Sequence, residues 1–380
     1  MTALEIMQKH YQQRDLAARD WKRKGGKVVG YFCDIVPEEL ILAAGFLPYR
    51  LSGDPLGGTE AVDVLLFRPG GPPEGFVHSI FNMLLTQKCD FLDFLIIPNT
   101  RASIQKLYFI LVNIKASSPS LKLPKIYFFD NLHTTFYLSG LYVRDRVFEL
   151  KEKLEEWSGK KISDELLSKA ITITNENRTL QKKVAALRTA EPPRISGVEA
   201  LQIIGSSMFM LKEEYNKLLR EFLDGASKLP ARSGARIFVE GSPLDNLQLY
   251  KIIESSSATV VSEDNCWGNR YSDKLVNTSA NPLEAIVDRY LNKAPCPQML
   301  PLSQRVDNCL NSALEAKAQG VIFNVLERDN SLNWEIPDEK AAFEQRKIPH
   351  LYLKDQKYLI FEPDRLTASI EEFVKTIKMS

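Results

Sequence analysis

The chain has 380 residues, of which 44% are hydrophobic and 26% are charged. This balance is typical of globular proteins and excludes a wholly disordered or coiled-coil chain. With 49 Lys and Arg against 48 Asp and Glu, the formal net charge is +1, so no overall field favours nucleic acid or an anionic membrane as a partner. Five cysteines are too sparse, and odd in number, for a secreted disulfide framework.

The amino-terminal segment carries charges throughout and has no apolar core of the kind found in signal peptides. The most apolar stretch, residues 91–98, is far shorter than the roughly 20 residues that span a bilayer. The sequence therefore predicts a cytoplasmic protein that does not cross a membrane.

Short apolar runs alternate with helical periodicity through the first part of the chain. Residues 4–22 have the spacing of an amphipathic opening helix. The apolar runs predict strands at residues 27–32, 46–51, 91–98 and 125–129. Helices are predicted between them, at residues 38–44 and 103–115. Strands that are apolar on both faces and alternate with helices indicate a parallel sheet covered by helices.

The second part repeats this pattern after a helical interval. Residues 141–226 lack convincing strands and predict successive helices, and residues 230–234 have the composition of a linker. Further strands are predicted at residues 236–240, 259–262, 320–324 and 349–353. A helix at residues 369–378 closes the chain. The fold class is therefore α/β, with two parallel-sheet domains of Rossmann or flavodoxin-like type joined by a helical segment, and with expected boundaries at 1–140, 141–230 and 231–380.

The cysteines are the first candidates for a functional site. Cys33 and Asp34 lie on a strand-to-helix turn, where open parallel sheets place their ligands. Cys266 also follows a strand, and Cys296 stands between two prolines that hold the backbone extended. A buried turn residue or a rigid loop remains an alternative for each. Cys89 precedes a strand, at its amino end, where packing is the simpler interpretation.

Other chemistry-bearing residues give weaker signals. Cys309 lies in a predicted helix, residues 304–319, at a spacing that favours core packing. Acids at strand ends, such as Asp34, Glu240 and Asp264, are candidates for acid–base work or simply cap helices. The sequence contains no Walker A, G-x-G-x-x-G, G-x-S-x-G, H-E-x-x-H or C-x-x-C motif, so standard nucleotide, hydrolase and zinc signatures are absent.

Several segments, spread over nearly the whole chain, carry a family resemblance. They are GYFCDIVPEEL (30–40), AAGFLP (43–48), NENR (175–178), EDNCWGNR (263–270), GVI (320–322) and IPHL (348–351). In order and spacing they resemble the 2-hydroxyacyl-CoA dehydratase and benzoyl-CoA reductase family, including its double-cubane cluster branch. The resemblance implies a cytoplasmic subunit that pairs with a homologous subunit, takes an acyl-CoA substrate, and receives electrons from an ATP-dependent activator protein.

The chain departs from the family at the positions that bind the usual 4Fe-4S cluster. The resemblance places three cysteines where this chain has His78, Arg101 and Asp329. Loss of the thiolates removes the soft ligands that such clusters require, so the usual cluster is expected to be missing. Cys33, Cys89, Cys266 and Cys296 lie where the double-cubane branch tends to carry cysteines, and they are candidate ligands of an iron–sulfur cluster or residues that only pack.

Three functional hypotheses follow from the resemblance. The first is a subunit of a heteromeric acyl-CoA dehydratase or reductase in which Asp34 or Ser52 orients or protonates the substrate. The second is a non-catalytic partner that keeps the fold to complete a heterodimer. The third is a metal-free enzyme acting on CoA esters, with Cys33 as its nucleophile.

Overall fold

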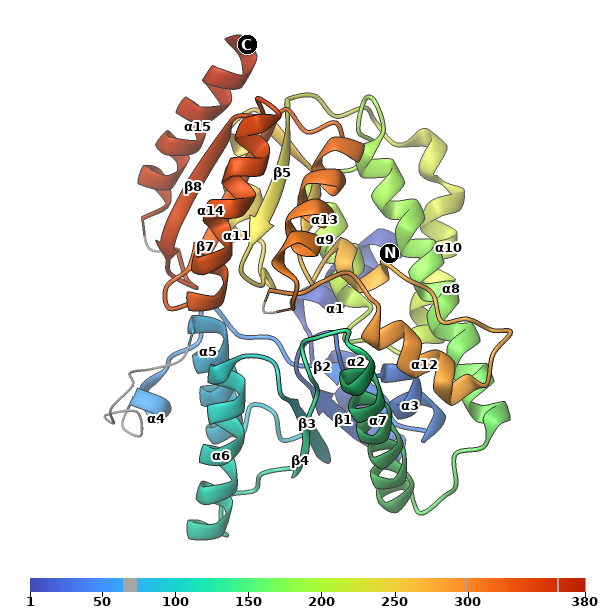
Figure 1. Ribbon diagram of the computed structural model, residues 1–380. Helices are drawn as coiled ribbons and strands as arrows, with labels where there is room; N and C mark the ends of the chain where they lie inside the picture. Colours follow the sequence, from blue (N-terminus) through green and yellow to red (C-terminus); the bar gives the residue numbers. More distant parts are fainter. Residues whose placement is uncertain (64–73, 298, 361, 380) are drawn as a thin grey trace.

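Two four-stranded parallel sheets form the framework of the protein in the computed structural model (Figure 1). The structure describes residues 1–63, 74–297, 299–360 and 362–379. The first sheet contains β1 (Val28–Tyr31), β2 (Leu47–Arg50), β3 (Phe94–Pro98) and β4 (Lys125–Phe129). The second contains β5 (Ala235–Gly241), β6 (Ala258–Asp264), β7 (Gly320–Leu326) and β8 (His350–Gln356). The predicted α/β class with two parallel sheets is confirmed.

Both sheets have the same strand order. The first runs β2-β1-β3-β4 and the second β6-β5-β7-β8, which is the flavodoxin-like arrangement with the second strand at one edge. In this arrangement the connections that follow β1 and β3 pass over opposite faces of the first sheet, and those that follow β5 and β7 pass over opposite faces of the second. A crevice therefore opens at the carboxyl ends of each of these strand pairs. The topology therefore provides two crevices, one in each sheet.

Helices cover the faces of both sheets because the strands are apolar on each side. The helices that alternate with the first sheet's strands are α3 (Glu38–Ala43), α4 (Glu60–Asp63), α5 (Gly75–Leu85) and α6 (Ala102–Ser117). Those of the second sheet are α11 (Gln248–Ser255), α12 (Pro282–Leu291), α13 (Leu302–Glu315), α14 (Asn330–Gln345) and α15 (Pro363–Met379). In Figure 1, α15 lies outside β8 at the edge of the upper sheet.

A helical layer runs along the side of both sheets. It consists of α7 (Tyr137–Ser158), α8 (Asp164–Thr189), α9 (Gly197–Ser206) and α10 (Lys212–Asp224). The long helix α8 contacts α3 below the second sheet and β6 within it. Since one helix packs against elements of both sheets, it fixes one sheet relative to the other.

The hydrophobic cores also join distant parts of the chain. Leu95 of β3 and Ile237 of β5 belong to one cluster of buried side chains. Val276 and Ile286, from the second half of the chain, pack with β1 and α7 in another cluster. Segments far apart in sequence therefore share cores, and α12 covers the first sheet although it lies in sequence between β6 and β7 of the second.

The amino-terminal segment differs from its prediction as a single helix. It forms α1 (Ala3–Gln12) and α2 (Leu16–Arg23). Between them Gln13 leaves helical geometry, with φ −106° and ψ 71°, and the Arg14 guanidinium donates a hydrogen bond of 2.8 Å to the carbonyl oxygen of Gly53. This contact with a distant loop holds the break between the two helices.

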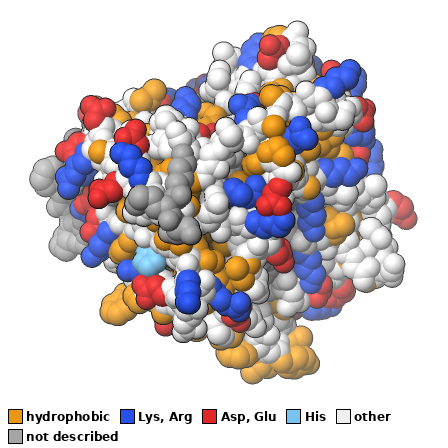
Figure 2. All heavy atoms as spheres, turned by 90° about the horizontal axis from the view of Figure 1, so that it is seen from above, with side chains coloured by type: hydrophobic (Ala, Val, Ile, Leu, Met, Phe, Trp, Pro, Cys, Tyr) orange, Lys and Arg blue, Asp and Glu red, His pale blue; other side chains and the backbone are white. Residues whose placement is uncertain are grey.

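The surface mixes charges of both signs. On the face shown in Figure 2, basic and acidic side chains alternate, and hydrophobic side chains gather toward its lower edge. Among the residues that the structure describes, no helix is long and apolar enough to cross a membrane.

Candidate functional site where the two sheets meet

A pocket lies between the carboxyl edges of the two sheets. Its lining includes Cys33, Asp34, Thr100 and Arg101 from loops of the first sheet, and Pro243, Cys266 and Arg270 from loops of the second. The crevices of the two sheets therefore face each other at one place, which is where doubly wound folds bind ligands. The space inside that a water molecule can enter is about 30 Å³, enough for one or two waters.

Three of the four predicted cysteine ligands line this pocket. Cys33 follows β1, Cys266 follows β6, and Cys296 lies in the loop between α12 and α13. Cys89 is not among the lining residues; it is buried in the turn before β3, in the core beside Tyr49. The structure thus brings three of the thiols to one pocket and places the fourth in a hydrophobic core.

Cys266 is held by a buried arginine at the end of β2. Arg50 donates one hydrogen bond of 2.6 Å to the carbonyl oxygen of Cys266 and another of 2.9 Å to its Sγ. The same guanidinium lies 4.3 Å from the ring centroid of Trp267. Two donors of a planar group on one residue fix the direction of the thiol, so Cys266 points toward the pocket in a single orientation.

The other two thiols, Cys33 and Cys296, are half-buried in the pocket wall. Burial raises the pKa of Cys33 to about 12, although a contact of 3.5 Å with the Thr100 hydroxyl lowers it in part. Burial also raises the pKa of Cys296, against the effect of Arg270. Both are therefore neutral thiols near pH 7, and Cys33 needs a base or a change of surroundings before it acts as a nucleophile. Cys33 also has φ 59°, a conformation that non-glycine residues seldom adopt.

Asp34 is an ionised carboxylate in this pocket. Burial raises its pKa, but Lys293, Arg50 and Arg270 outweigh that effect and bring the pKa to about 2. Lys293 donates a hydrogen bond directly to Asp34 Oδ2. Asp34 is therefore suited to accept a hydrogen bond and to orient a substrate, and not to donate a proton at neutral pH. Ser52 is buried just beyond β2 and is not among the lining residues.

Two of the three positions where the resemblance expects cluster cysteines form an ion pair. Arg101 Nη1 lies 2.7 Å from Asp329 Oδ1, with side chains only 6% and 1% exposed. Asp329 Oδ2 accepts a hydrogen bond of 2.6 Å from Ser242, and Glu74 lies 3.7 Å from the same guanidinium. The ion pair joins the loop after β3 to the loop after β7 and so connects the two crevices.

His78 occupies the third of these positions, on α5. Its backbone N–H donates to the carbonyl oxygen of Glu74 at 3.0 Å, so it lies one helical turn from a neighbour of Arg101. These residues do not fit an iron–sulfur cluster, because none is a thiol and Arg101 and Asp329 already neutralise each other.

A second set of acids and cations has a structural role. Glu38 and Glu39 of α3 form, with Arg178 of α8 and Lys212 of α10, what we name the glutamate-pair cluster. Arg178 donates to Glu39 at 2.6 Å, and Lys212 lies 2.9 Å from Glu38. From the sequence, these two acids were predicted only as part of the helix at residues 38–44.

Two residues that act on the thiol pocket, Arg50 and Lys293, were not predicted from the sequence. The one signal that could have identified Arg50 is its position at the carboxyl end of a strand.

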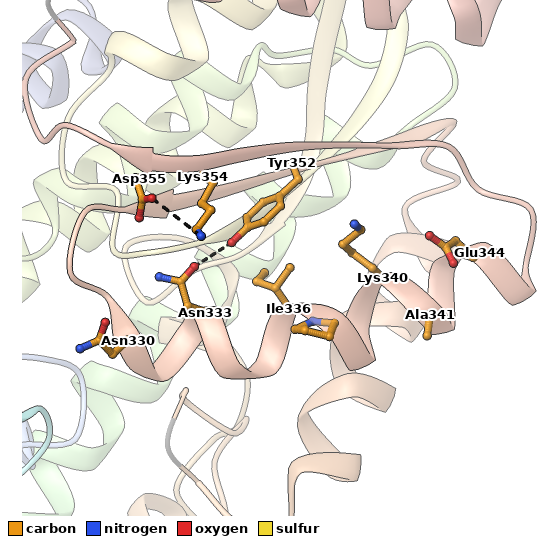
Figure 3. A pocket seen from close by; sticks show the side chains of 10 residues that line it. Asn330, Asn333, Ile336, Lys340, Ala341, Glu344, Tyr352, Lys354 and Asp355 are labelled. Carbon is orange, nitrogen blue, oxygen red and sulfur yellow. Dashed lines mark hydrogen bonds and ion pairs between the residues drawn. The ribbon is translucent and has the colours of Figure 1, made fainter.

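A larger groove lies elsewhere, between α14 and β8 (Figure 3). It has a volume of about 680 Å³ and is open to solvent. Tyr352 donates a hydrogen bond of 2.7 Å to Asn333 across it, and Lys354 lies beside Asp355. No predicted site residue lines this groove, so the smaller thiol pocket remains the better candidate site.

Comparison with known proteins identifies relatives over most of the chain. The profile of the family described as "2-hydroxyglutaryl-CoA dehydratase, D-component" matches residues 33–374. One of the subunits of benzoyl-CoA reductase from Thauera aromatica is 27% identical, with 90% of each chain covered. The (R)-phenyllactyl-CoA dehydratase beta subunit of Clostridium sporogenes is 24% identical, and the match covers 94% of this chain and 93% of the relative.

A third relative has the same character. The (R)-2-hydroxyglutaryl-CoA dehydratase beta subunit of Acidaminococcus fermentans is 24% identical, with 87% of each chain covered. All three relatives are named as subunits of enzymes that act on CoA esters. Their full-length matches agree with the family that the sequence motifs resemble.

Proposed function

Because the chain belongs to the 2-hydroxyglutaryl-CoA dehydratase D-component family, we propose that it is one subunit of a heteromeric acyl-CoA dehydratase or reductase and that it carries no 4Fe-4S cluster at the family's usual position. Its relatives are named as subunits of such enzymes. In this proposal a homologous subunit supplies the redox centre, and an ATP-dependent activator delivers electrons to the complex in the cytoplasm.

The observation that carries this proposal is the buried ion pair of Arg101 and Asp329. A charged pair with 2.7 Å between its atoms is favourable in a protein interior only while both partners are present. A cluster at this place would have to displace both side chains and leave Ser242 and Glu74 without their contacts. The buried pair therefore supports the proposal that this chain carries no cluster at the family's usual position.

The pocket beside the ion pair is suited to orienting an acyl group. Asp34 offers a carboxylate acceptor, and Cys33, Cys266 and Cys296 surround it with weakly polar sulfur. Ligand pockets usually measure about 300–1,000 Å³, against about 30 Å³ here, so entry of a thioester requires the lining loops to separate. In this proposal, docking of the partner subunit against these loops separates them and opens the pocket.

An apolar surface patch adjoins the pocket and supports a docked subunit. It consists of the exposed side chains Leu132, Phe136, Tyr137, Leu138, Leu141 and Leu300. Leu300 is joined to this loop by a backbone hydrogen bond of 3.0 Å to His133, and Leu132 and His133 also line the pocket. Exposed apolar groups gathered in one place mark protein interfaces, and this one reaches the site itself.

Iron and sulfide analysis of the anaerobically purified chain tests the absence of a cluster. We expect fewer than about one iron per chain, since even one cubane contains four. A companion variant replaces all three positions together (His78→Cys, Arg101→Cys, Asp329→Cys) and is expected to gain iron on reconstitution, whereas wild type does not. About four irons in wild type, lost in Cys33→Ser or Cys266→Ser, would overturn this part of the proposal.

Co-expression with a homologous subunit that carries the three cysteines tests the complex. Size-exclusion chromatography is expected to show a stable heteromer, which the double variant Tyr137→Glu/Leu138→Glu abolishes. Phe109→Glu is the matched control, because Phe109 is equally apolar and 57% exposed but lies on α6, outside the patch. Retention of the heteromer in the double variant would show that the patch is not the interface.

The activity of the reconstituted heteromer distinguishes the proposed enzyme subunit from a non-catalytic partner subunit. Asp34→Asn is expected to reduce turnover of a 2-hydroxyacyl-CoA or aromatic acyl-CoA at least tenfold while the heteromer still forms. Unchanged turnover would favour a structural partner subunit. Thioester exchange that persists in air and disappears in Cys33→Ser would instead favour the metal-free enzyme.

A further inference from the structure

A second group of potential ligands lies inside the carboxyl-terminal half, away from the thiol pocket. It consists of Glu240 of β5, Cys309 of α13 and Glu339 of α14, each with a side chain that is 0% exposed. One carboxylate oxygen from each glutamate and the Cys309 Sγ all lie within 4.8 Å of one another. Among the residues that the structure describes, this is the one group of three His, Cys, Asp or Glu side chains whose ligand atoms lie this close together.

The charges around this group do not balance. Arg305 of α13 contacts four carboxylates, which together with it we name the Arg305 cluster: Glu240, Asp264, Glu335 and Glu339. Arg270 supplies one further positive charge, 3.2 Å from Asp264. Four acids face two cations, so the cluster would carry a charge of about −2 if every acid were ionised. Burial raises the pKa of Glu240 well above its usual value and that of Glu339 to about 7, so without an ion these acids retain protons.

Glu339 lacks the partners that a buried carboxylate needs. Both of its oxygens are buried without a hydrogen-bond partner, and its nearest cation, Arg305, is 3.5 Å from Oε1. The three ligand atoms lie within 4.8 Å of one another, close to the separation of roughly 3–4 Å between atoms that bind one ion at about 2.0–2.3 Å from the metal.

We propose that Glu240, Cys309 and Glu339 bind one divalent transition-metal ion, and that the ion is Zn²⁺. A divalent ion would displace the protons that these buried acids retain and would balance the charge of the ionised cluster. One thiolate and two carboxylates form a mixed ligand set that suits Zn²⁺ better than Mg²⁺ or Ca²⁺, which bind oxygen alone. Cys309 already contacts Glu240 Oε2 at 3.7 Å, and loss of its proton completes the set.

The site has a structural consequence. Its ligands come from three elements, although Asp264 of the same cluster also lines a surface hollow of about 380 Å³. Bound by its three ligands, the ion fastens α13 and α14 to the central strand β5. This role is independent of the acyl-CoA chemistry proposed above, because none of its three ligands lines the thiol pocket.

Metal analysis of the full-length chain, purified without a metal-affinity tag from zinc-supplemented culture, tests the proposal. We expect about one zinc per chain in wild type and less than about 0.2 in Cys309→Ser and in Glu339→Gln. Cys89→Ser is the matched control, since Cys89 is also buried but lies in another core, and it is expected to retain zinc. Zinc that is lost in Cys33→Ser, Cys266→Ser or Cys296→Ser instead would overturn the assignment.

A spectroscopic readout covers the case in which these variants fail to fold. Chelator-treated wild type reloaded with Co²⁺ is expected to show a thiolate-to-cobalt charge-transfer band, and Zn²⁺ is expected to raise the melting temperature of the chelated chain by several degrees. Less than about 0.1 zinc per chain that does not rise on incubation with Zn²⁺, with no cobalt band and no thermal shift, would contradict the proposal whatever the variants do.

Discussion

Two buried ionic clusters of the molecule differ in how well their charges are satisfied. In the glutamate-pair cluster, two acids meet two cations, and every carboxylate oxygen has a partner: Tyr271 donates to Glu38, and Tyr290 donates to Glu39 at 2.9 Å. In the Arg305 cluster, four acids meet two cations, Arg305 and Arg270, and Glu339 has no hydrogen bond. The first is complete as it stands, whereas the second is completed by an ion.

The difference separates structure from binding. A balanced buried cluster holds elements together, here α3, α8 and α10, and loses stability when any member is removed. An unbalanced cluster tolerates loss of an acid and loses stability when its cation is removed. Substitutions in the two clusters are therefore expected to change the free energy of unfolding by different amounts and, for some acids, in opposite directions.

The largest effect is expected when the central cation of the Arg305 cluster is removed. Arg305→Met leaves four buried acids around an uncharged side chain, so we expect a loss of about 5 kcal/mol in the free energy of unfolding, or failure to fold. Urea denaturation of chelator-treated protein measures it. Arg365→Met is the control, because Arg365 is 86% exposed, and its substitution is expected to change stability by less than about 0.5 kcal/mol. A loss below about 2 kcal/mol at Arg305 would contradict the charge imbalance.

The glutamate-pair cluster is expected to respond to acid. Burial raises the pKa of Glu39, but Arg178 and Arg289 outweigh it and lower the pKa from 4.5 to about 2. Because the folded-state pKa lies below the unfolded value, this stabilisation is fully present above pH 4.5 and is lost as the pH falls toward 2. The ionised Glu39 carboxylate therefore contributes on the order of 3 kcal/mol to the free energy of unfolding at neutral pH.

Glu39→Gln checks this expectation. At pH 7 the variant is expected to lose about 3 kcal/mol in the free energy of unfolding, because Arg178 then has no ionised partner at 2.6 Å. Between pH 4.5 and pH 2 the variant is expected to lose less stability than wild type, because glutamine does not titrate. Parallel pH profiles of the two proteins would show that Glu39 does not carry the acid dependence.

The ion pair of Arg101 and Asp329 is intermediate in expected effect, since one cation faces two buried acids, Asp329 and Glu74. Arg101→Met is expected to cost about 3 kcal/mol, because Asp329 remains buried and charged. The double variant Arg101→Met/Asp329→Leu is expected to cost less than the sum of the two single variants, by about 2 kcal/mol, in a thermal or urea double-mutant cycle. Strict additivity would show that the two side chains do not interact in solution.

The fold was predictable from the sequence because buried parallel strands have a simple signature. Runs such as Leu95–Ile97 are apolar on both faces, and apolar runs separated by helical periodicity define the two sheets. The place of Cys33 and of Cys266 at the carboxyl edge of a sheet was also predictable, since both follow strands. The two residues belong to different sheets, and it is the packing of one sheet on the other that brings them to one pocket. The same rule set Cys89 apart, because it precedes its strand.

The charged partners of the site were not predictable, because they depend on tertiary contacts. Lys293 pairs with Asp34 across 259 positions of sequence, and no local pattern links the two. Glu339 has the spacing of an ordinary surface acid on a helix, yet α13 packs over it and leaves it 0% exposed. Cys309 was assigned to core packing, and its burial agrees; its two glutamate neighbours come from different elements and gave no sequence signal.

The smallest expected effect gives the sharpest contrast between the clusters. In the metal-free chain, Glu339→Gln removes one of the surplus acids and leaves Arg305 with three carboxylates, so the free energy of unfolding is expected to change by less than about 1 kcal/mol and to rise if it changes. The chemically identical change at Glu39 is expected to cost about 3 kcal/mol, because there each acid is matched by a cation. With zinc present, wild type is expected to be more stable than Glu339→Gln, because wild type gains free energy of unfolding from the bound ion and the variant does not. Urea denaturation with and without chelator therefore measures both effects on one pair of proteins, and equal losses at Glu39 and Glu339 without metal would show that the two clusters are balanced alike.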